Sequence, residues 1–460
     1  MRTPAKALSS VGEAPSDEGQ RWLLRGGTVL PIDDAQQELR ADVRIRGGHI
    51  TVVAPDVAPT EDETVIDCTG CVILPGFVQT HIHLCQTLFR NLADDLSLLD
   101  WLAQRIWPLE ASHTYESLSA SARLGVGELL LGGTTALVDM GTVHHTEAIF
   151  ETLIEGGIRA VAGKCMMDAP DGPDGLREPT DTSLSDSLAL AERYDGAANG
   201  RIRYGFAPRF VLSCTDGLLS AVSKEAASRG LWVHTHSSEN VDEVAIVRDR
   251  SGGEGNVAFL ARLGIRGDKT VLAHCIHLDD EEITELATAG THVSHCVSSN
   301  LKLGSGVADV PGLIERGVSV SLGADGAPCN NRLDMFTEMR TAALVQKPRY
   351  GPTAMPAGDV LALATRAGAK VLGREDDLGQ VQPGFVADLQ VLRLDGLSDG
   401  PGGSLASRIV YAATRQAVQH VFVDGQRLVA NGALCRWNKQ AIIDEATQAL
   451  VGCVERAALT

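Results

Sequence analysis

Short apolar stretches recur through the middle of the chain, and amphipathic segments separate them. Eight of these stretches have the length of buried strands, at residues 77–83, 134–141, 158–164, 202–209, 231–239, 270–277, 291–299 and 318–326. Buried strands that alternate with helices form parallel sheets, and eight parallel strands close into a barrel. The pattern therefore predicts an α/β fold, a (β/α)8 TIM barrel over residues 75–378.

The two flanks of the barrel have a different pattern. Residues 22–74 and 379–437 alternate apolar and polar positions over short distances, as in WLLRGGTVLPI and QHVFVDGQRLVANGA. We expect both flanks to form one small β-sandwich domain. Residues 1–21 are expected to be a flexible N-terminal lead, and residues 438–460 a C-terminal helix.

Composition narrows the class of protein. Hydrophobic residues make up 44% and charged residues 22%, which predicts a folded chain with a real core. The formal charge of -19 disfavours nucleic acid and anionic membranes as partners, and no stretch reaches the roughly 20 apolar residues of a membrane span.

The cysteines indicate a compartment. Ten are scattered singly along the chain, which is typical of the reducing cytoplasm. Cys68 and Cys71 form a CxxC motif without a second pair, so two packed thiols are a better interpretation than a zinc ribbon or a redox centre.

Histidines at the predicted strand ends indicate a metal site. His81 and His83 alternate on the first strand, so both imidazoles project to the same side. His236 and Glu239 end the fifth strand, His274 the sixth and Asp325 the eighth. The carboxyl ends of barrel strands meet at one rim, where barrel enzymes build their sites.

The metal ligands predicted at this rim are His81, His83, His236 and Asp325. Three imidazoles and one carboxylate suit one divalent ion, Zn²⁺ in the first place and Fe²⁺ as the alternative. Lys164 follows the third strand rather than the fourth, which favours one metal over a bridged pair. We expect His234, deeper on the fifth strand, to support the site or to fill the core.

Three long segments resemble the amidohydrolase superfamily, in its aminohydrolase branch. They are PGFVQTHIHLCQTLFRNLADDLSLLDWLAQRIWPLE, HCVSSNLKLGSG and GADGAPCNNRLDMFTEMR. They are similar to segments of 5'-deoxyadenosine, methylthioadenosine/S-adenosylhomocysteine and guanine deaminases and of triazine hydrolases. The resemblance covers nearly the whole chain and implies a homo-oligomeric hydrolase.

Charge suggests how such a site would act on a heterocyclic amine, a small molecule. A divalent ion lowers the pKa of water toward ~7, and Asp325 can accept the proton that is released. Glu239 is the candidate acid that protonates the ring nitrogen and then serves the leaving ammonia. His274 is expected to orient the attacking water or to polarise the tetrahedral centre.

Three residues are candidates for substrate binding. Gln86 follows the first strand and could pair with a purine or triazine edge, while Arg209 could meet a ring oxygen or nitrogen or form a structural salt bridge. Both also resemble heterocycle contacts of guanine deaminases. Trp101 either walls the pocket or packs its helix.

Other residues near the predicted strand ends stay open. His144 and His145 could approach the pocket mouth or lie in an exposed loop. Cys329 resembles the cysteine of deaminating triazine relatives, which favours amine release.

The sequence thus predicts a deaminase of aminopurine nucleosides such as 5'-deoxyadenosine or methylthioadenosine. The alternatives are a guanine-type base deaminase or an aminotriazine hydrolase, and, in another class, a non-catalytic barrel scaffold.

Overall fold

A closed parallel barrel forms the centre of the molecule. The computed structural model describes residues 20–34, 37–400 and 402–459. The barrel strands follow sequence order: β6 (Phe77–His83), β7 (Thr134–Met140), β8 (Arg159–Gly163), β10 (Ile202–Pro208), β11 (Trp232–Ser237), β12 (Thr270–His274), β13 (His292–His295) and β14 (Ser319–Leu322). The short strand β15 (Asp325–Gly326) comes directly after β14 and pairs with β6, which closes the ring. The predicted (β/α)8 barrel is confirmed.

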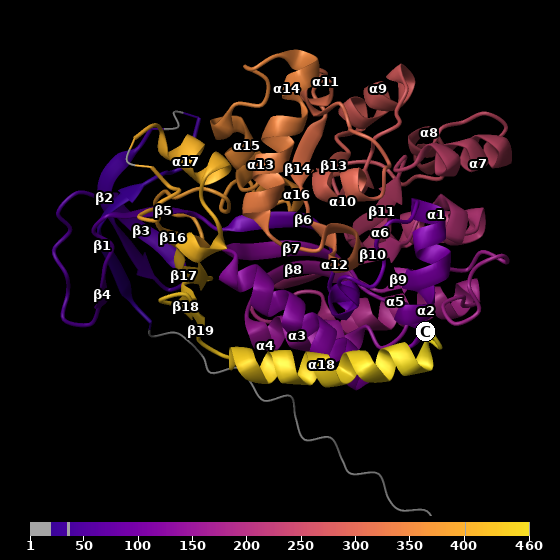
Figure 1. The fold of residues 1–460 in the computed structure, drawn as a ribbon, viewed down its shortest axis with the longest axis horizontal. Coiled ribbons are helices and arrows are strands. Elements are labelled where there is room, and N and C mark those ends of the chain that lie inside the picture. Colours follow the sequence, from indigo (N-terminus) through magenta and orange to yellow (C-terminus); the bar gives the residue numbers. More distant parts are fainter. Residues whose placement is uncertain (1–19, 35–36, 401, 460) are drawn as a thin grey trace, which may run out of the picture.

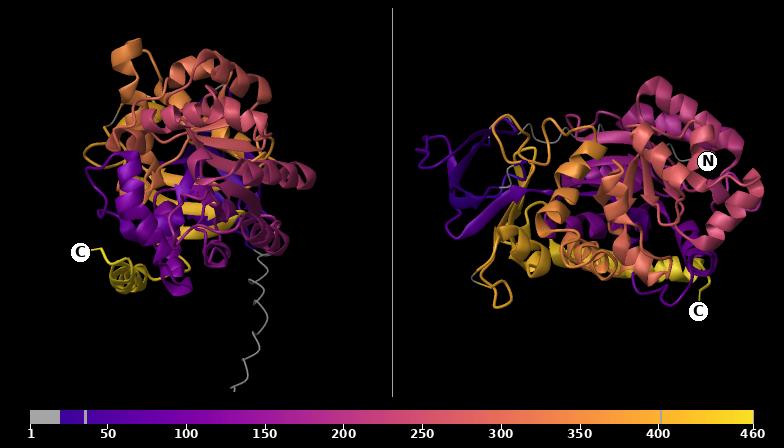
Figure 2. Two further views of the ribbon diagram at one scale, coloured as in Figure 1. Left: turned by 90° about the vertical axis from the view of Figure 1, so that its right-hand side faces the viewer. Right: turned by 90° about the horizontal axis from the view of Figure 1, so that it is seen from above.

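Helices surround the barrel and connect its strands (Figures 1 and 2). Their bounds are α3 (Tyr115–Leu131), α4 (Glu147–Gly156), α5 (Thr180–Tyr194), α6 (Asp216–Arg229), α7 (Val241–Ser251), α8 (Asn256–Arg262), α9 (Asp280–Ala289), α10 (Val297–Lys302), α11 (Val310–Glu315), α12 (Ala327–Asn330), α13 (Met335–Val345), α14 (Lys347–Tyr350), α15 (Ala357–Leu363) and α16 (Arg366–Val371). Thr215, Asn240 and Asp279 cap α6, α7 and α9 by accepting from free N–H groups of the first turn. These caps define where each strand-to-helix loop ends.

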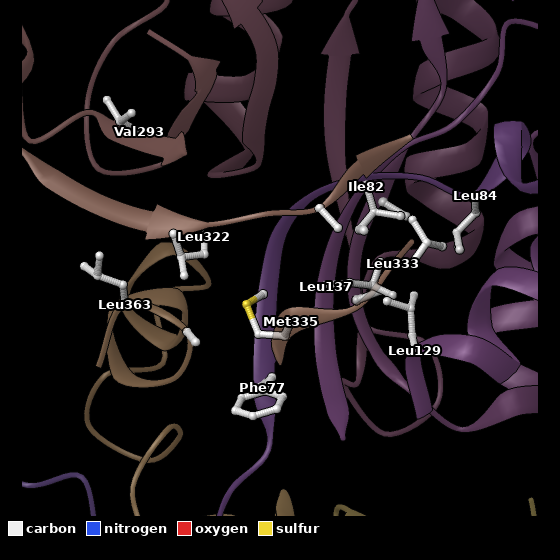
Figure 3. Close-up of a cluster of buried hydrophobic side chains, with 14 of the residues drawn as sticks. Phe77, Ile82, Leu84, Leu129, Leu137, Val293, Leu322, Leu333, Met335 and Leu363 are labelled. Atoms are coloured by element: carbon white, nitrogen blue, oxygen red, sulfur yellow. The ribbon is translucent and has the colours of Figure 1, made fainter. Parts of the chain in front are cut away.

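Apolar side chains fix β6 against the helix layer. Figure 3 shows Phe77 and Ile82 of β6 near Leu137 of β7 and near Met335, at the start of α13. All four side chains are fully buried. Truncation of such residues typically costs 2–5 kcal/mol, so this packing holds β6 firmly in position.

The two flanks of the chain meet in one mixed sheet of nine strands. Its members are β1 (Trp22–Val29), β2 (Leu39–Arg46), β3 (His49–Ala54), β4 (Thr64–Asp67), β5 (Cys71–Pro75), β16 (Leu389–Arg393), β17 (Val418–Val423), β18 (Gln426–Ala430) and β19 (Ala433–Leu434). β5 and β16 pair antiparallel, so this small domain is built from both ends of the chain, as expected. The predicted N-terminal lead lies almost wholly outside the described residues.

Polar contacts attach the flanks to the barrel, among them the following two. Arg159 of β8 donates to Asp388, just before β16, over 2.8 Å, and both side chains are buried. The last helix, α18 (Lys439–Arg456), lies along α3, where Arg123 donates to Glu445 over 2.7 Å (Figure 1). The described part of the chain contains no helix long and apolar enough to cross a bilayer.

Candidate active site

Five side chains from four strand segments meet at the carboxyl rim of the barrel. β6 carries His81 and His83, β11 carries His236, β12 carries His274 and β15 carries Asp325. The Nε2 atoms of His83 and His236 lie 3.2 Å apart, and Oδ1 of Asp325 lies 3.2 Å from His81 Nε2 and 3.4 Å from His83 Nε2. The sequence-predicted ligands are therefore brought together.

His274 belongs to the same group. Ligand atoms of His81, His236, His274 and Asp325 all lie within 4.8 Å of one another. The sequence predicts that His274 acts on water beside the ion, whereas the structure places it in one group with three of the predicted ligands, His81, His236 and Asp325. His274 and Asp325 also have positive φ angles of 74° and 64°. Backbone strain of this kind gathers at functional sites.

The hydrogen bonds of the imidazoles fix which nitrogens face inward. Nδ1 of His83 donates to the carbonyl of Met140 over 3.0 Å, and Nδ1 of His236 donates to the carbonyl of Arg209 over 2.6 Å. In a neutral ring with a protonated Nδ1, Nε2 carries a lone pair. Two such lone pairs at 3.2 Å repel each other unless a cation lies between them, so the residues fit a metal ion.

Burial favours the protonation states that a metal requires. It lowers the pKa of His83 to about 3 and that of His236 well below its usual range, so both rings are neutral at pH 7. Burial alone would raise the pKa of Asp325, but the rings of His81 and His274 outweigh it and hold that pKa well below its usual range. Neutral imidazoles and an ionised carboxylate are the usual donors to a divalent ion.

Groups behind the cluster orient it. His234 Nε2 lies 2.7 Å from Nδ1 of His81, so His234 supports the site from deeper in the barrel. Asn300 Oδ1 accepts from Nδ1 of His274 over 2.8 Å, and Ser299 Oγ donates to Asp325 over 2.6 Å. Such outer contacts hold ligating side chains in position. Sequence reasoning missed Ser299 and Asn300, although they follow the seventh strand and obey the same rim rule.

Glu239 lies beside the cluster in a dry environment. Its Oε2 is 3.5 Å from His274 Nε2, and only 4% of the residue is exposed. Burial raises the pKa of Glu239 well above its usual range, and the nearby charges of Asp325 and Glu243 raise it further. The pKa values of two neighbouring carboxyl groups, Glu239 and Asp325, are thus shifted in opposite directions.

A narrow pocket opens beside the cluster, and Gln86, Trp101 and Arg209 line it together with Glu239 and apolar side chains such as Phe210. Gln86 lies in the turn η1 (Leu84–Phe89). Trp101 ends α1 (Leu98–Trp101), which continues through a π-helical turn, η2 (Leu102–Ile106), into α2 (Trp107–Ala111). All three predicted substrate residues therefore lie at the pocket.

Glu110 of α2 joins two of them, and sequence reasoning missed it. Its Oε2 accepts from Arg209 over 2.6 Å, and its Oε1 accepts from Gln86 over 2.8 Å. Burial opposes ionisation of Glu110, but Arg209 outweighs burial and lowers its pKa. Arg209 is thus both ion-paired and part of the pocket. The signal was an acid within the otherwise apolar run IWPLEA, since buried acids need partners.

The remaining candidates do not line this pocket. Lys164 pairs with Glu178 over 2.5 Å, and with His144 and His145 they line a separate hollow. Cys329 is buried, and its Sγ donates to the carbonyl of Gly326 over 3.1 Å.

Known proteins resemble this chain over nearly its whole length. The model of the amidohydrolase family matches residues 72–428. The 5-methylthioadenosine/S-adenosylhomocysteine deaminase of Haloarcula marismortui is 37% identical over 95% of this chain and 99% of its own. The 5'-deoxyadenosine deaminase of Methanothermobacter thermautotrophicus is 40% identical over 91% and 95%. A zinc-bound adenosine deaminase from Xanthomonas campestris superimposes with a TM-score of 0.88 at 30% identity, over 95% of this chain and 99% of that one.

Proposed function

Because this chain belongs to the amidohydrolase family, we propose that it is a metal-dependent hydrolytic deaminase that releases ammonia from an aminopurine nucleoside. The substrates we favour, 5'-deoxyadenosine and methylthioadenosine, are those named in its relatives. One observation carries the proposal: Nε2 atoms of His81 and His83 lie within 3.4 Å of Asp325, beside a buried carboxyl group, Glu239, whose pKa burial raises.

We assign His81, His83, His236 and Asp325 as ligands of one divalent ion, with His274 beside it. Zn²⁺ is favoured over Fe²⁺ because the similar adenosine deaminase carries zinc. When bound, a divalent ion supplies Lewis-acid chemistry and lets water ionise near neutral pH.

The two carboxyl groups divide the proton transfers. Asp325, held ionised by the surrounding rings, accepts a proton from the attacking water. Glu239, held protonated by burial, donates its proton to the ring nitrogen next to the attacked carbon. The proton on Asp325 then leaves with the amino group as ammonia, and the hydroxyl proton of the tetrahedral centre returns to Glu239 as the ring carbonyl forms. His274 is within reach to donate to, or accept from, the oxygen at the attacked carbon.

The pocket supplies contacts for a heterocycle. Oε1 of Gln86 is buried and has no hydrogen-bond partner within the described chain, so it is available to accept from a substrate N–H. Trp101 forms an apolar wall. Arg209, a buried cation in the same pocket, favours a ring that carries a carbonyl oxygen, which supports a guanine-type base as the second candidate.

Ammonia release from a substrate panel tests the proposal. We expect turnover of 5'-deoxyadenosine or methylthioadenosine to exceed that of adenosine, guanine and melamine. Asp325→Asn and Glu239→Gln should each lower kcat at least 100-fold, whereas His49→Gln, an exposed histidine of the small domain, should leave it unchanged. Guanine as the best substrate would favour the second candidate. A purified protein without metal, and without turnover after Zn²⁺ or Fe²⁺ is added, would favour the scaffold.

We further propose a cytoplasmic homo-oligomer. All ten cysteines are free thiols, which is compatible with a reducing compartment, and the oligomer rests on the family resemblance alone. Light scattering during size-exclusion chromatography tests the oligomeric state.

A further inference from the structure

Another hollow lies outside the barrel, lined by residues of α3, α18 and the last strands of the small domain. Figure 1 shows these elements side by side. It has a volume of about 500 Å³, within the range of small-molecule sites. Its floor is apolar and includes Leu131, Leu434 and Ile442. Gly127 faces this floor, since a side chain there would touch Leu434 and Ile442 at 3.4 and 3.5 Å. Because Gly127 has no side chain, Leu434 and Ile442 stay uncovered at this point.

Basic side chains surround this hollow, which we call the α3–α18 groove. A neighbouring cavity of about 550 Å³ shares part of its rim, including Arg90 and Arg415. The basic residues lining the two are Arg90, Arg332, Arg340, Arg415 and Lys439, and the acidic ones are Glu128 and Asp334. This region is therefore positive in a chain whose formal charge is -19. A positive region on a negatively charged protein attracts anions and raises their local concentration.

Most of these cations are not neutralised by the protein. Glu128 accepts from Arg90 over 3.1 Å and from the backbone N–H of Leu333, so its charge is already engaged. Arg415 is 3.9 Å from Glu128, and 58% of its side chain is exposed. Lys439 makes no hydrogen bond or ion pair through its side chain within residues 20–459 as described. Guanidinium and ammonium groups remain available at the edge of an apolar floor.

We propose that the α3–α18 groove binds a small amphipathic carboxylate. Its apolar body packs on Leu434 and Ile442, and its carboxylate lies against Arg415, whose planar guanidinium matches a carboxylate. The apolar floor selects against fully polar anions, and the rim selects against neutral apolar molecules. None of the groove residues lines the catalytic pocket, so the inference does not depend on the proposed function.

Isothermal titration of the full-length protein with octanoate tests the site. Octanol has the same apolar body without charge, and acetate has the charge without the body. We expect octanoate to bind at least ten-fold more tightly than either, with an affinity that weakens as salt is added. The proposal would be overturned if octanoate did not bind, or if octanoate and octanol bound equally well.

Two groove variants locate the binding. Arg415→Glu and Ile443→Asp both change exposed side chains, so neither should prevent folding. Each should weaken octanoate binding at least ten-fold. Arg349→Glu is the matched control, because it changes the net charge equally at a side chain that is 62% exposed and lies outside the groove. Octanoate affinity that is the same in all three variants would place the site elsewhere and overturn the proposal.

A second copy of the chain is the rival occupant. In that case light scattering would show an oligomer that Ile443→Asp dissociates, and octanoate would not bind the wild-type protein. That pair of results would also overturn the proposal.

Discussion

Removal of the Glu110 carboxylate should destabilise the protein strongly. Glu110 accepts from both terminal nitrogens of Arg209, over 2.6 and 3.2 Å, and both side chains are at most 3% exposed. In Glu110→Ala the guanidinium keeps its charge in a buried site without a partner, which costs about 3–5 kcal/mol. Gln86 also loses a hydrogen bond to a charged group, which adds about 1.5–3 kcal/mol.

A double variant separates the stranded charge from the loss of packing. Glu110→Ala with Arg209→Met leaves no buried cation, so we expect the double variant to be more stable than Glu110→Ala alone by about 3 kcal/mol. Glu445→Ala is the control: its partner Arg123 is also an arginine, but 44% of the glutamate side chain is exposed. It should cost less than about 1 kcal/mol.

Urea denaturation followed by tryptophan fluorescence measures these differences at pH 7. The folded state lowers the pKa of Glu110, so the stabilisation is complete above the unfolded pKa of about 4.3 and is lost as the pH falls through the folded pKa. The gap between wild type and Glu110→Ala should therefore shrink below pH 4. A cost below 1 kcal/mol at pH 7, or no recovery in the double variant, would refute the reasoning.

Three further predictions follow from the site. Removal of bound metal with a chelator should abolish ammonia release and lower the melting temperature, and Zn²⁺ should restore both; full activity in metal-free protein would contradict the assigned ligands. Asn300→Ala removes the acceptor of His274 Nδ1 and should lower kcat 10–100-fold with metal retained, as elemental analysis can check. Burial raises the pKa of Asp139 in β7 to about 7, so the contribution of Asp139 to stability should fall by about 3 kcal/mol as the pH rises from 4 to 7. In Asp139→Asn the urea midpoint should fall less over this pH range than in the wild type. Midpoints that change in parallel in both proteins would contradict the raised pKa of Asp139.

Local sequence patterns predicted much of the fold. Period-2 alternation and short buried runs depend on neighbouring residues only, and they predicted the barrel strands and their order. The strand rule also placed His81 and His83 on one side, as their ring centroids at 4.8 Å bear out. The same alternation predicted the β-rich flanks. Their pairing through β5 and β16 is a long-range contact: Gln390 donates to the carbonyl of Pro75, which lies 315 positions earlier in the chain.

The protonation states and partners of the site came only with the folded structure. Glu239 and Asp325 are both carboxyl groups in the sequence, and burial and the neighbouring rings alone give them opposite pKa shifts. The pairing of Arg209 with Glu110 joins residues 99 positions apart. No local pattern encodes such a contact.

By itself the sequence determined which polar side chains stand at the strand ends and which of them share a side, because side-chain direction along a strand is a local property. Tertiary structure decided which of them share a dry pocket, which are charged there and which surface hollows collect like charges. Desolvation and Coulomb energies depend on distances through space, and only the closed barrel sets those distances.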